Sequence, residues 1–501
     1  MEVTLFKKKI DLIKIKEVVI GLIGTAALAA TIVLFCNAQN AVYQTHKDIW
    51  YAKALFMLAA FLFVTQRVRL FNWQSLVASV LYLPLGYMYR EARSFAPDLF
   101  NRDRVVVWVV WILLMIVVDM AVYKKHTPLE KFHKGALALF AATAVFMIFF
   151  RNGRNYPIML VIAFVFYMIP LSSDSWKKLT NRFSYGWLAA FVIMLVRSIV
   201  NNPQVNDYNG RWYGDFLNIG DFGLFMGCVM AVVLYKLYQI KKEKGRKSVE
   251  YVLWIVALLA ALWTTFRVST VTAFIGIALI VLAGLIVVRK EITVKKAIFS
   301  TVVVVVAVLL VAVAGFFTLK ALANTDAEYW NQMLVEGNTL VKPLADIIDR
   351  AHYMFSEPIT FADSGIFEAD SFINYVDLFT SGRLSIIKVF SEYFNFSGNV
   401  SMGMQVGTYF AYNTHNTYSQ LIFDYGYIGG GLFILWLLYC LVSSAGQYIK
   451  EKKNVQVVGV LWMAMTLGVL LGESANLYVP VMVMTLIITY PVLVKVDEKM
   501  V

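Results

Sequence analysis

The sequence contains little charge: Asp, Glu, Lys and Arg make up 15% of its 501 residues, whereas 60% are hydrophobic. A soluble domain has about 25% charged and about 45–50% apolar residues, so lipid must replace water over much of this protein's surface. The same composition excludes a disordered chain, a collagen, a coiled coil and a disulfide-stapled secreted module. The sequence therefore predicts an all-α, polytopic membrane protein.

Cysteine is also scarce, with three residues and no C-x-x-C spacing. Cys36, Cys228 and Cys440 fall within or beside apolar stretches, which favours packing over a disulfide frame or a thiolate metal site. No G-x-x-x-x-G-K-[ST] motif is present, which argues against a P-loop nucleotide step. Within residues 318–415, Glu368 and Asp370 are the carboxylate pair that comes nearest to the D-x-D pattern of a divalent-ion site. We expect neither a metal nor a cofactor.

Long apolar stretches are abundant, and a membrane-spanning helix needs about 20 such residues. We expect about 14 transmembrane helices, with a range of 12–14. They divide the chain into residues 1–317 with helices 1–11, a large outer loop at 318–415, and residues 416–501 with helices 12–14. The predicted cores are residues 18–38, 49–65, 73–89, 105–123, 135–150, 156–171, 186–200, 217–239, 251–266, 268–288, 297–317, 416–444, 455–472 and 477–494.

The net charge of +13 is explained by topology. Cytoplasmic loops of membrane proteins collect Lys and Arg, and placing the N-terminus inside puts most of the basic residues on that side. Clusters at 124–134, 177–182 and 236–247 then all lie in the cytoplasm. Both termini are predicted to be cytoplasmic, and the first apolar stretch is interpreted as an uncleaved span. Nucleic-acid binding is not needed to explain the charge.

The stretch from 318 to 415 is too long for a structureless connection. Its eleven acidic and five basic residues make it net acidic, which argues against an electrostatic clamp on nucleic acid. Helical spacing predicts an amphipathic helix at 340–355 and a second helix at 383–394, with Ser381 as a candidate cap. Three glycines in the following segment indicate turns: Gly398, Gly403 and Gly407.

His415 is the histidine with the most informative position, because it ends the large outer loop and opens the next predicted span. A helix N-terminus disfavours a positive charge, and a neutral imidazole at the membrane surface can act as a general base. The alternative is a histidine that only caps or anchors the helix.

Gly426 and Gly429 follow His415 by eleven and fourteen positions. At 100° per residue they would form a stripe of small residues beneath it on one continuous helix, where a neighbouring helix or a lipid chain could approach. Such stripes are equally ordinary devices of helix packing. Asp424 would point away from His415 and is expected to pair within the bundle.

These residues resemble a known family. His415-Asn416, nine residues, Gly426, two residues and Gly429 match the H-N-x9-G-x-x-G signature of the bacterial O-antigen ligase and polymerase superfamily. Ser381-Gly382-Arg383 is similar to the family's S-G-R. The segment 265–269 resembles its S-R-G, although Val268 replaces the glycine, and Asn218-Ile219-Gly220 resembles the start of its middle span. The resemblance covers roughly residues 210–440 and implies a GT-C-like fold.

Four arginines lie on the predicted outer side, where topology does not explain them: Arg197, Arg211, Arg267 and Arg383. Guanidinium groups match phosphate oxygens in pairs, so a diphosphate would account for them. Arg383 would also sit unfavourably at a helix N-terminus unless something else holds it. The alternatives are snorkelling to lipid head groups or pairing with one of the carboxylates Asp207, Asp215, Asp221 and Asp377.

The resemblance implies an integral-membrane glycosyltransferase that is metal-independent and inverting. An undecaprenyl diphosphate would carry the donor oligosaccharide, and His415 would deprotonate an acceptor hydroxyl on the outer face. The diphosphate would be held by Arg267 and Arg383 first, then by Arg211 and Arg197. Asn416, Gly426 and Gly429 would support the site.

Two related activities and one unrelated activity stay open. We favour a surface polysaccharide polymerase, for O-antigen, capsule or exopolysaccharide, over a ligase that transfers the glycan to lipid A core. A lipid-linked oligosaccharide flippase is the third reading, although such transporters should have short outer loops. The expected location is the bacterial inner membrane. The expected partners are the lipid-linked donor and acceptor, membrane lipids, and chain-length regulators or other assembly proteins, with no nucleic acid.

Overall fold

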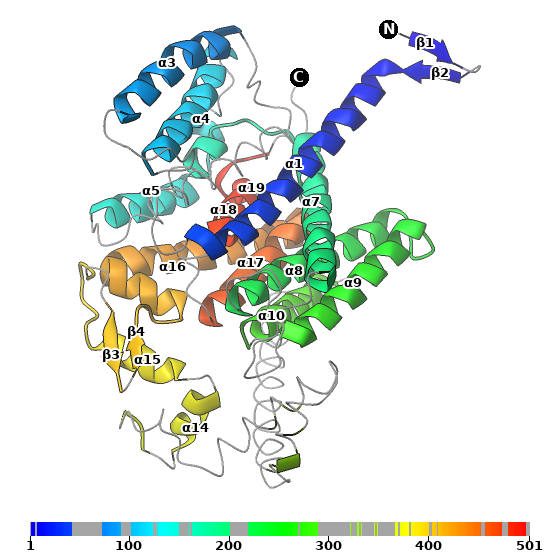
Figure 1. The fold of residues 1–501 in the computed structure, drawn as a ribbon. Helices are drawn as coiled ribbons and strands as arrows, with labels where there is room; N and C mark the ends of the chain where they lie inside the picture. The colour runs from blue at the N-terminus through cyan, green and yellow to red at the C-terminus, as the bar shows by residue number, and fades with distance from the viewer. Residues whose placement is uncertain are drawn as a thin grey trace. The chain divides into compact units, whose positions relative to one another are not determined.

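The computed structural model is mostly helical (Figure 1). Apart from a few isolated helical positions, the structure describes residues 2–5, 8–42, 73–91, 102–123, 127, 129–149, 160, 163–200, 219–268, 271–288, 366–368, 371–379, 382–399, 403–407, 409–451, 456–472 and 479–496. These residues divide into two compact units. Residues 1–134, 158–197 and 482–501 make the first, and residues 135–157 and 198–481 make the second.

The first unit begins with an antiparallel hairpin, β1 (Glu2–Leu5) and β2 (Lys8–Asp11), that leads into α1 (Leu12–Val42). Next come α3 (Trp73–Glu91) and α4 (Arg102–Tyr123). The indole of Trp111 on α4 donates to Ser79 Oγ on α3 at 3.0 Å. Most of α7 (Ser173–Val200) also belongs here, and Leu28 of α1 packs directly over Gly186 of α7.

The end of the chain closes the first unit. After α18 (Val479–Ile488) and α19 (Tyr490–Leu493), Val494 forms a β-bridge with Phe132. Tyr490 is fully buried, and its hydroxyl donates to Ile169 O at 2.8 Å and accepts from Leu171 N at 3.1 Å. The C-terminal helices are therefore tied to the segment that precedes α7.

Four helices make the core of the second unit. They are α8 (Ile219–Glu243), α9 (Val249–Val268), α10 (Val271–Val288) and α17 (Val457–Gly472). Almost every residue of α17 is buried, as expected for a helix that is apolar on all sides. Its Gly468 lies against Gly276 of α10, where an added Cβ would be 3.0 Å from the Gly276 Cα. Small residues at this crossing let the two backbones touch.

A small layer on α16 (Thr417–Glu451) completes the second unit. It comprises α14 (Phe372–Phe379), α15 (Arg383–Ser391) and the antiparallel hairpin of β3 (Met404–Val406) and β4 (Tyr409–Ala411). Its apolar core contains Ile386, Phe390, Met404, Val406, Ala411 and Phe423. Elsewhere α16 packs on α5 (Lys134–Phe149), where the Phe140 and Trp436 rings meet edge to face at 5.3 Å.

Helices occupy most of the predicted spans. Those predicted at 73–89, 105–123, 135–150 and 455–472 agree with α3, α4, α5 and α17 to within three residues. Of the described helices, three are long and apolar enough to cross a membrane: Ser173–Val200, Phe222–Glu243 and Thr417–Glu451. The predicted cores 49–65 and 297–317 lie outside the described residues, as does most of the predicted helix 340–355. Of the predicted core 156–171, residues 160 and 163–171 are described.

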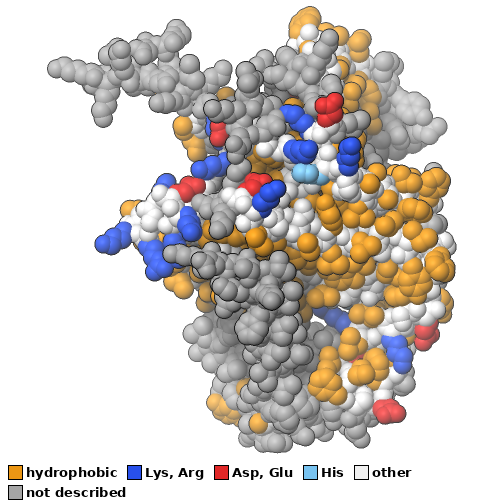
Figure 2. All heavy atoms as spheres, turned by 180° about the vertical axis from the view of Figure 1, so that it is seen from behind, with side chains coloured by type: hydrophobic (Ala, Val, Ile, Leu, Met, Phe, Trp, Pro, Cys, Tyr) orange, Lys and Arg blue, Asp and Glu red, His pale blue; other side chains and the backbone are white. Residues whose placement is uncertain are grey.

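Hydrophobic side chains cover much of the face drawn in Figure 2. The exposed apolar residues of the described helices include Val249, Leu253, Leu259, Leu435 and Val442, each at least 54% exposed. In water the hydrophobic effect would favour turning such side chains inward. An exposed apolar surface of this kind is therefore typical of a membrane protein.

Candidate functional site

Arg383 is the first residue of α15, as the sequence predicted, although the helix ends at Ser391 rather than at Phe394. Its N-cap is Gly382, with φ of 76°; the predicted cap, Ser381, lies outside the described residues. The carboxylate of Asp377 substitutes for a capping side chain by accepting from Ser385 N at 2.9 Å and Ser385 Oγ at 2.5 Å. This carboxylate suits the positive end of the α15 dipole.

The guanidinium of Arg383 donates to the carbonyl oxygen of Gly472, the last residue of α17. The C-terminal end of a helix carries a partial negative charge and carbonyls without intrahelical partners, so a cation is favourable there. This contact supplies the missing explanation for a cation at the start of α15.

Two further side chains donate to the same end of α17. Asn416 Nδ2 donates to Leu471 O at 2.8 Å, and the Tyr418 hydroxyl donates to Leu467 O at 2.8 Å. We call Arg383, Asn416 and Tyr418 the α17 cap. Two predicted site residues from separate segments, Arg383 and Asn416, thus bind consecutive carbonyls of one helix.

Asn416 joins two helix ends. Its Oδ1 accepts from Ser419 N at 3.0 Å, which makes it the N-cap of α16, while its Nδ2 holds Leu471 of α17. Its side chain is 8% exposed. An asparagine is well suited to this position because one amide group offers both an acceptor and a donor.

His415 lies just outside α16, which begins at Thr417. It has φ of 47°, and within the described residues no other non-glycine residue has a positive φ. Asn413 Oδ1 accepts from His415 N at 2.9 Å, and the buried Thr414 donates from its N to Gln420 Oε1 at 2.9 Å. Histidine tolerates the left-handed region better than most residues, and such constrained backbone is frequent at functional sites. The imidazole is half-buried.

The prediction that Gly426 and Gly429 lie in a stripe beneath His415 is wrong, because α16 is not one continuous helix. Gly426 has φ of 70° and ψ of 177°, which breaks the helix into residues 417–425 and a long second part. An added Cβ at Gly430 would be 2.4 Å from Leu421 O, whereas nine residues of straight helix span about 13 Å. The two parts therefore fold sharply against each other.

A turn at residues 395–399, which we call the wedge turn, fits into this break. In a regular helix Tyr427 N would donate to Phe423 O. Here Tyr427 N donates to Asn395 O at 2.9 Å, and Phe423 O accepts from Asn399 N at 2.7 Å. The wedge turn thus provides both groups that the broken helix lacks. Gly398, with φ of 81°, lies so close that an added Cβ would be 2.3 Å from Asp424 O.

The end of α9 reaches the same edge of the second unit. Gly472 packs against Thr272, the second residue of α10, and α10 follows α9 after two residues. Arg267 is in the last turn of α9, so its backbone lies near this edge; its side chain is not described. The start of α8 also lies at this edge, since α8 and α9 form an antiparallel pair.

The other predicted residues are placed as follows. Arg211 lies outside the described residues. Arg197 is exposed in α7 and belongs to the first unit. Asp424 is 5% exposed and accepts from Gln420 Nε2, four residues earlier in the chain, at 2.8 Å. In the described part of the chain, no group of three His, Cys, Asp or Glu side chains is arranged to hold a metal ion.

Sequence reasoning missed Tyr418 and the two asparagines of the wedge turn, and it named Asp377 only as a possible partner of Arg383, not as the acceptor for Ser385. Asn395 and Asn399 flank Gly398, a composition that signals a turn but not what the turn contacts. Asp377 lies six residues before Arg383, a spacing that matches no capping pattern.

No protein-family model, curated protein or solved structure matches this chain.

Proposed function

We propose that the protein is an integral-membrane glycosyltransferase that uses a polyprenyl diphosphate-linked oligosaccharide, with undecaprenyl as the carrier. The acceptor would be a sugar hydroxyl on a second lipid-linked chain, so that the product is a surface polysaccharide. The reaction would take place on the outer face of the bacterial inner membrane, in a bundle of about 14 spans with both termini in the cytoplasm.

One observation carries the proposal. Arg383, from the large loop, and Asn416, next to His415, donate to consecutive carbonyls at the end of α17. A cation that could stabilise a leaving diphosphate and the immediate neighbour of a histidine that could take a proton are therefore held by the same helix end. The constrained backbone of His415 adds support, because strain of this kind is retained where the surrounding structure fixes it.

The proposed reaction needs no redox partner. His415 accepts the proton of the acceptor hydroxyl, and the hydroxyl oxygen forms a bond to the anomeric carbon of the donor. The bond from that carbon to the diphosphate breaks, and polyprenyl diphosphate leaves with the electron pair. Arg383 and Arg267, followed by Arg211, neutralise the charge that develops on the diphosphate. Attack from the face opposite the leaving group inverts the anomeric configuration.

The test uses the purified full chain, a labelled oligosaccharide on undecaprenyl diphosphate as donor, and an unlabelled lipid-linked acceptor. We expect His415→Ala to lower turnover by at least about 100-fold while donor binding is retained. Arg383→Lys keeps the charge but loses the paired geometry, and we expect it to weaken donor binding. Tyr418→Phe serves as the matched control, because it removes another α17 cap contact without touching a charge.

The alternatives give different results. Product that forms only with lipid A core or another acceptor without a carrier would indicate a ligase. Transbilayer movement of the labelled lipid that survives His415→Ala, without any transfer, would indicate a flippase. Normal polymer formation by His415→Ala would remove the general-base assignment.

A further inference from the structure

The connection between α8 and α9 carries five cations within seven residues. They are Lys241, Lys242, Lys244, Arg246 and Lys247, and all five are exposed. We call residues 241–247 the basic turn. No part of the proposed glycosyl transfer uses it, because it lies at the end of the α8–α9 pair opposite Arg267.

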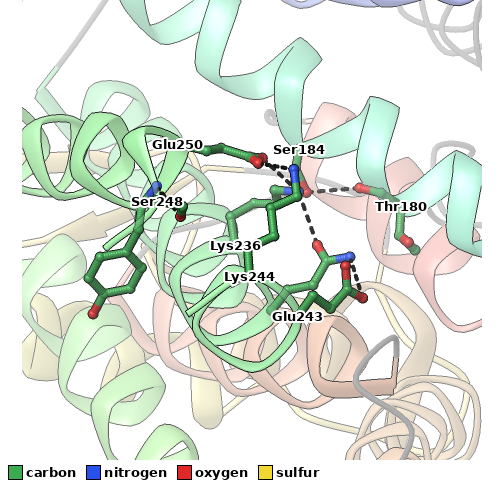
Figure 3. A network of polar contacts seen from close by, with 9 residues as sticks. Thr180, Ser184, Lys236, Glu243, Lys244, Ser248 and Glu250 are labelled. Atoms are coloured by element: carbon green, nitrogen blue, oxygen red, sulfur yellow. Dashed lines mark hydrogen bonds and ion pairs between the residues drawn. The ribbon is translucent and has the colours of Figure 1, made fainter. Parts of the chain in front are cut away.

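A polar network stiffens the inner side of the basic turn (Figure 3). Lys236 of α8 is 3% exposed, and its Nζ donates to Gln239 Oε1 at 3.0 Å and lies 3.9 Å from Glu250 Oε1. Lys244 Nζ binds Glu250 Oε2 at 2.6 Å, which raises the pKa of the Lys244 ammonium. Ser248 Oγ accepts from Tyr251 N at 3.3 Å in the first turn of α9.

The two carboxylates of this connection are thereby engaged toward the helices. Glu250 is held by Lys236 and Lys244, and Glu243 accepts from Gln239 Nε2 at 3.4 Å. The four remaining cations of the basic turn form no ion pair with any residue that the structure describes. The outward side of the turn is therefore strongly positive.

An apolar stripe on α9 leads up to the basic turn. Val249, Val252, Leu253, Val256 and Leu259 are between 54% and 77% exposed. Their spacing of three and four residues places them on one face of the helix. In a membrane this face contacts acyl chains, and the stripe begins two residues after Lys247. The basic turn is then at the level of the lipid head groups.

We infer that the basic turn binds the head groups of anionic phospholipids. Clusters of four or more Lys and Arg directly beside a membrane helix attract anionic lipid, about fivefold in affinity for each cation. The cations at 241, 242, 246 and 247 supply the charge, while the adjoining apolar stripe fixes the turn at head-group depth. A soluble phosphate or an acidic protein would not require that stripe. The inference does not depend on the proposed glycosyl transfer.

The test is native mass spectrometry of the full chain in detergent with equal amounts of phosphatidylglycerol and phosphatidylcholine. We expect the unmodified chain to retain at least about tenfold more phosphatidylglycerol. Replacing the four cations with Gln should reduce this preference to within about twofold. Exchanging Lys and Arg at the same four positions keeps the charge and should keep the preference.

A second variant separates position from net charge. Lys177, Lys178, Lys388 and Lys450 are exposed elsewhere, and replacing all four with Gln removes the same charge. An equal loss of preference in this control, or an unchanged preference in the basic-turn variant, overturns the inference. The inference is also overturned if inorganic phosphate alone displaces the lipid. It is overturned too if the basic-turn variant keeps the lipid and loses a bound acidic protein instead. If the basic-turn variant does not fold, the unmodified chain is measured at increasing salt concentration instead. Its preference for phosphatidylglycerol must then fall steeply between about 0.05 and 0.5 M salt.

Discussion

Two junctions in the second unit hold helices by opposite means. Where α10 crosses α17, Gly276 and Gly468 remove side chains so that the backbones touch. Where α16 breaks, Asn395 and Asn399 replace a missing helical hydrogen bond with two bonds from the wedge turn. A glycine contact depends only on shape, whereas paired hydrogen bonds also fix direction and register. The candidate site is connected to both junctions, because Arg383 and Asn416 bind the end of α17 and Asn416 also caps α16.

The largest expected effect is at the break. In Gly426→Ala the new Cβ would lie 2.1 Å from Phe396 O, and the residue would keep a positive φ. We expect the free energy of unfolding to fall by about 3–5 kcal/mol, as overpacking adds to backbone strain. Denaturant titration of the purified chain in detergent measures it. Gly431→Ala is the control, because nothing lies within 4 Å of its Cβ, and it should stabilise by about 0.5–1 kcal/mol.

The apolar junction should respond less. In Gly276→Ala the new Cβ meets Val469 Cγ1 at 2.8 Å, and a side chain can move where a backbone carbonyl cannot. The expected loss is about 1–3 kcal/mol by the same titration. Gly284→Ala, whose Cβ would have an ordinary contact at 3.9 Å with Leu461, should be neutral or stabilising. Equal losses at Gly276 and Gly426 would show that the two junctions do not differ in kind.

The two hydrogen bonds of Asn416, one to α16 and one to α17, can be tested separately. Asn416→Ala removes the N-cap of α16 and leaves Leu471 O without this donor, at an expected cost of about 2 kcal/mol. Asn416→Ser keeps a side-chain acceptor for the start of α16 and loses the donor to Leu471 O, so its loss should be smaller. A loss for Asn416→Ser as large as for Asn416→Ala would assign the whole effect to the bond with Leu471.

The smallest effect concerns the cap of α15. Ser385→Ala removes the bond from Ser385 Oγ to Asp377 while the backbone bond stays, so we expect a loss of about 1 kcal/mol. Ser391→Ala removes an exposed bond to Lys388 O in the same helix and should change little. Each substitution removes one hydroxyl hydrogen bond, one buried and one exposed. The difference between their midpoints of thermal unfolding therefore measures the effect of burial on the bond.

The helices were predictable because apolar length is a local property. α3, α5 and α17 begin and end close to the limits of their apolar stretches. The start of α15 at Arg383 was predictable for a similar reason, since a Ser-Gly pair precedes it. Sequence alone therefore gave the positions of the helices but not how many of them cross the membrane.

The break in α16 was not predictable in the same way. The window 416–444 is apolar enough for one span, and a glycine within it is compatible with a helix. What breaks the helix is the wedge turn, which lies in another segment. The β3–β4 hairpin was interpreted only as turns, because its strands are three residues long and its glycines dominate the pattern.

The candidate site was predictable in residue type but not in contact. Sequence singled out Arg383, His415 and Asn416, yet it assigned Arg383 to a diphosphate and gave no sign of Gly472. The partner is a backbone carbonyl, and a carbonyl at a helix end has no signature in the sequence. Whether one guanidinium serves both the helix end and a phosphate is the question that Arg383→Lys addresses.

The wedge turn also sets an order of events during synthesis. Asn399 precedes Phe423 by 24 residues, so the ribosome makes the turn before it makes the helix that the turn interrupts. Chains generally fold from the N-terminus as they emerge, and a contact this local closes quickly. The second part of α16 therefore receives its direction from a five-residue segment that is already present when this part of the helix is synthesised.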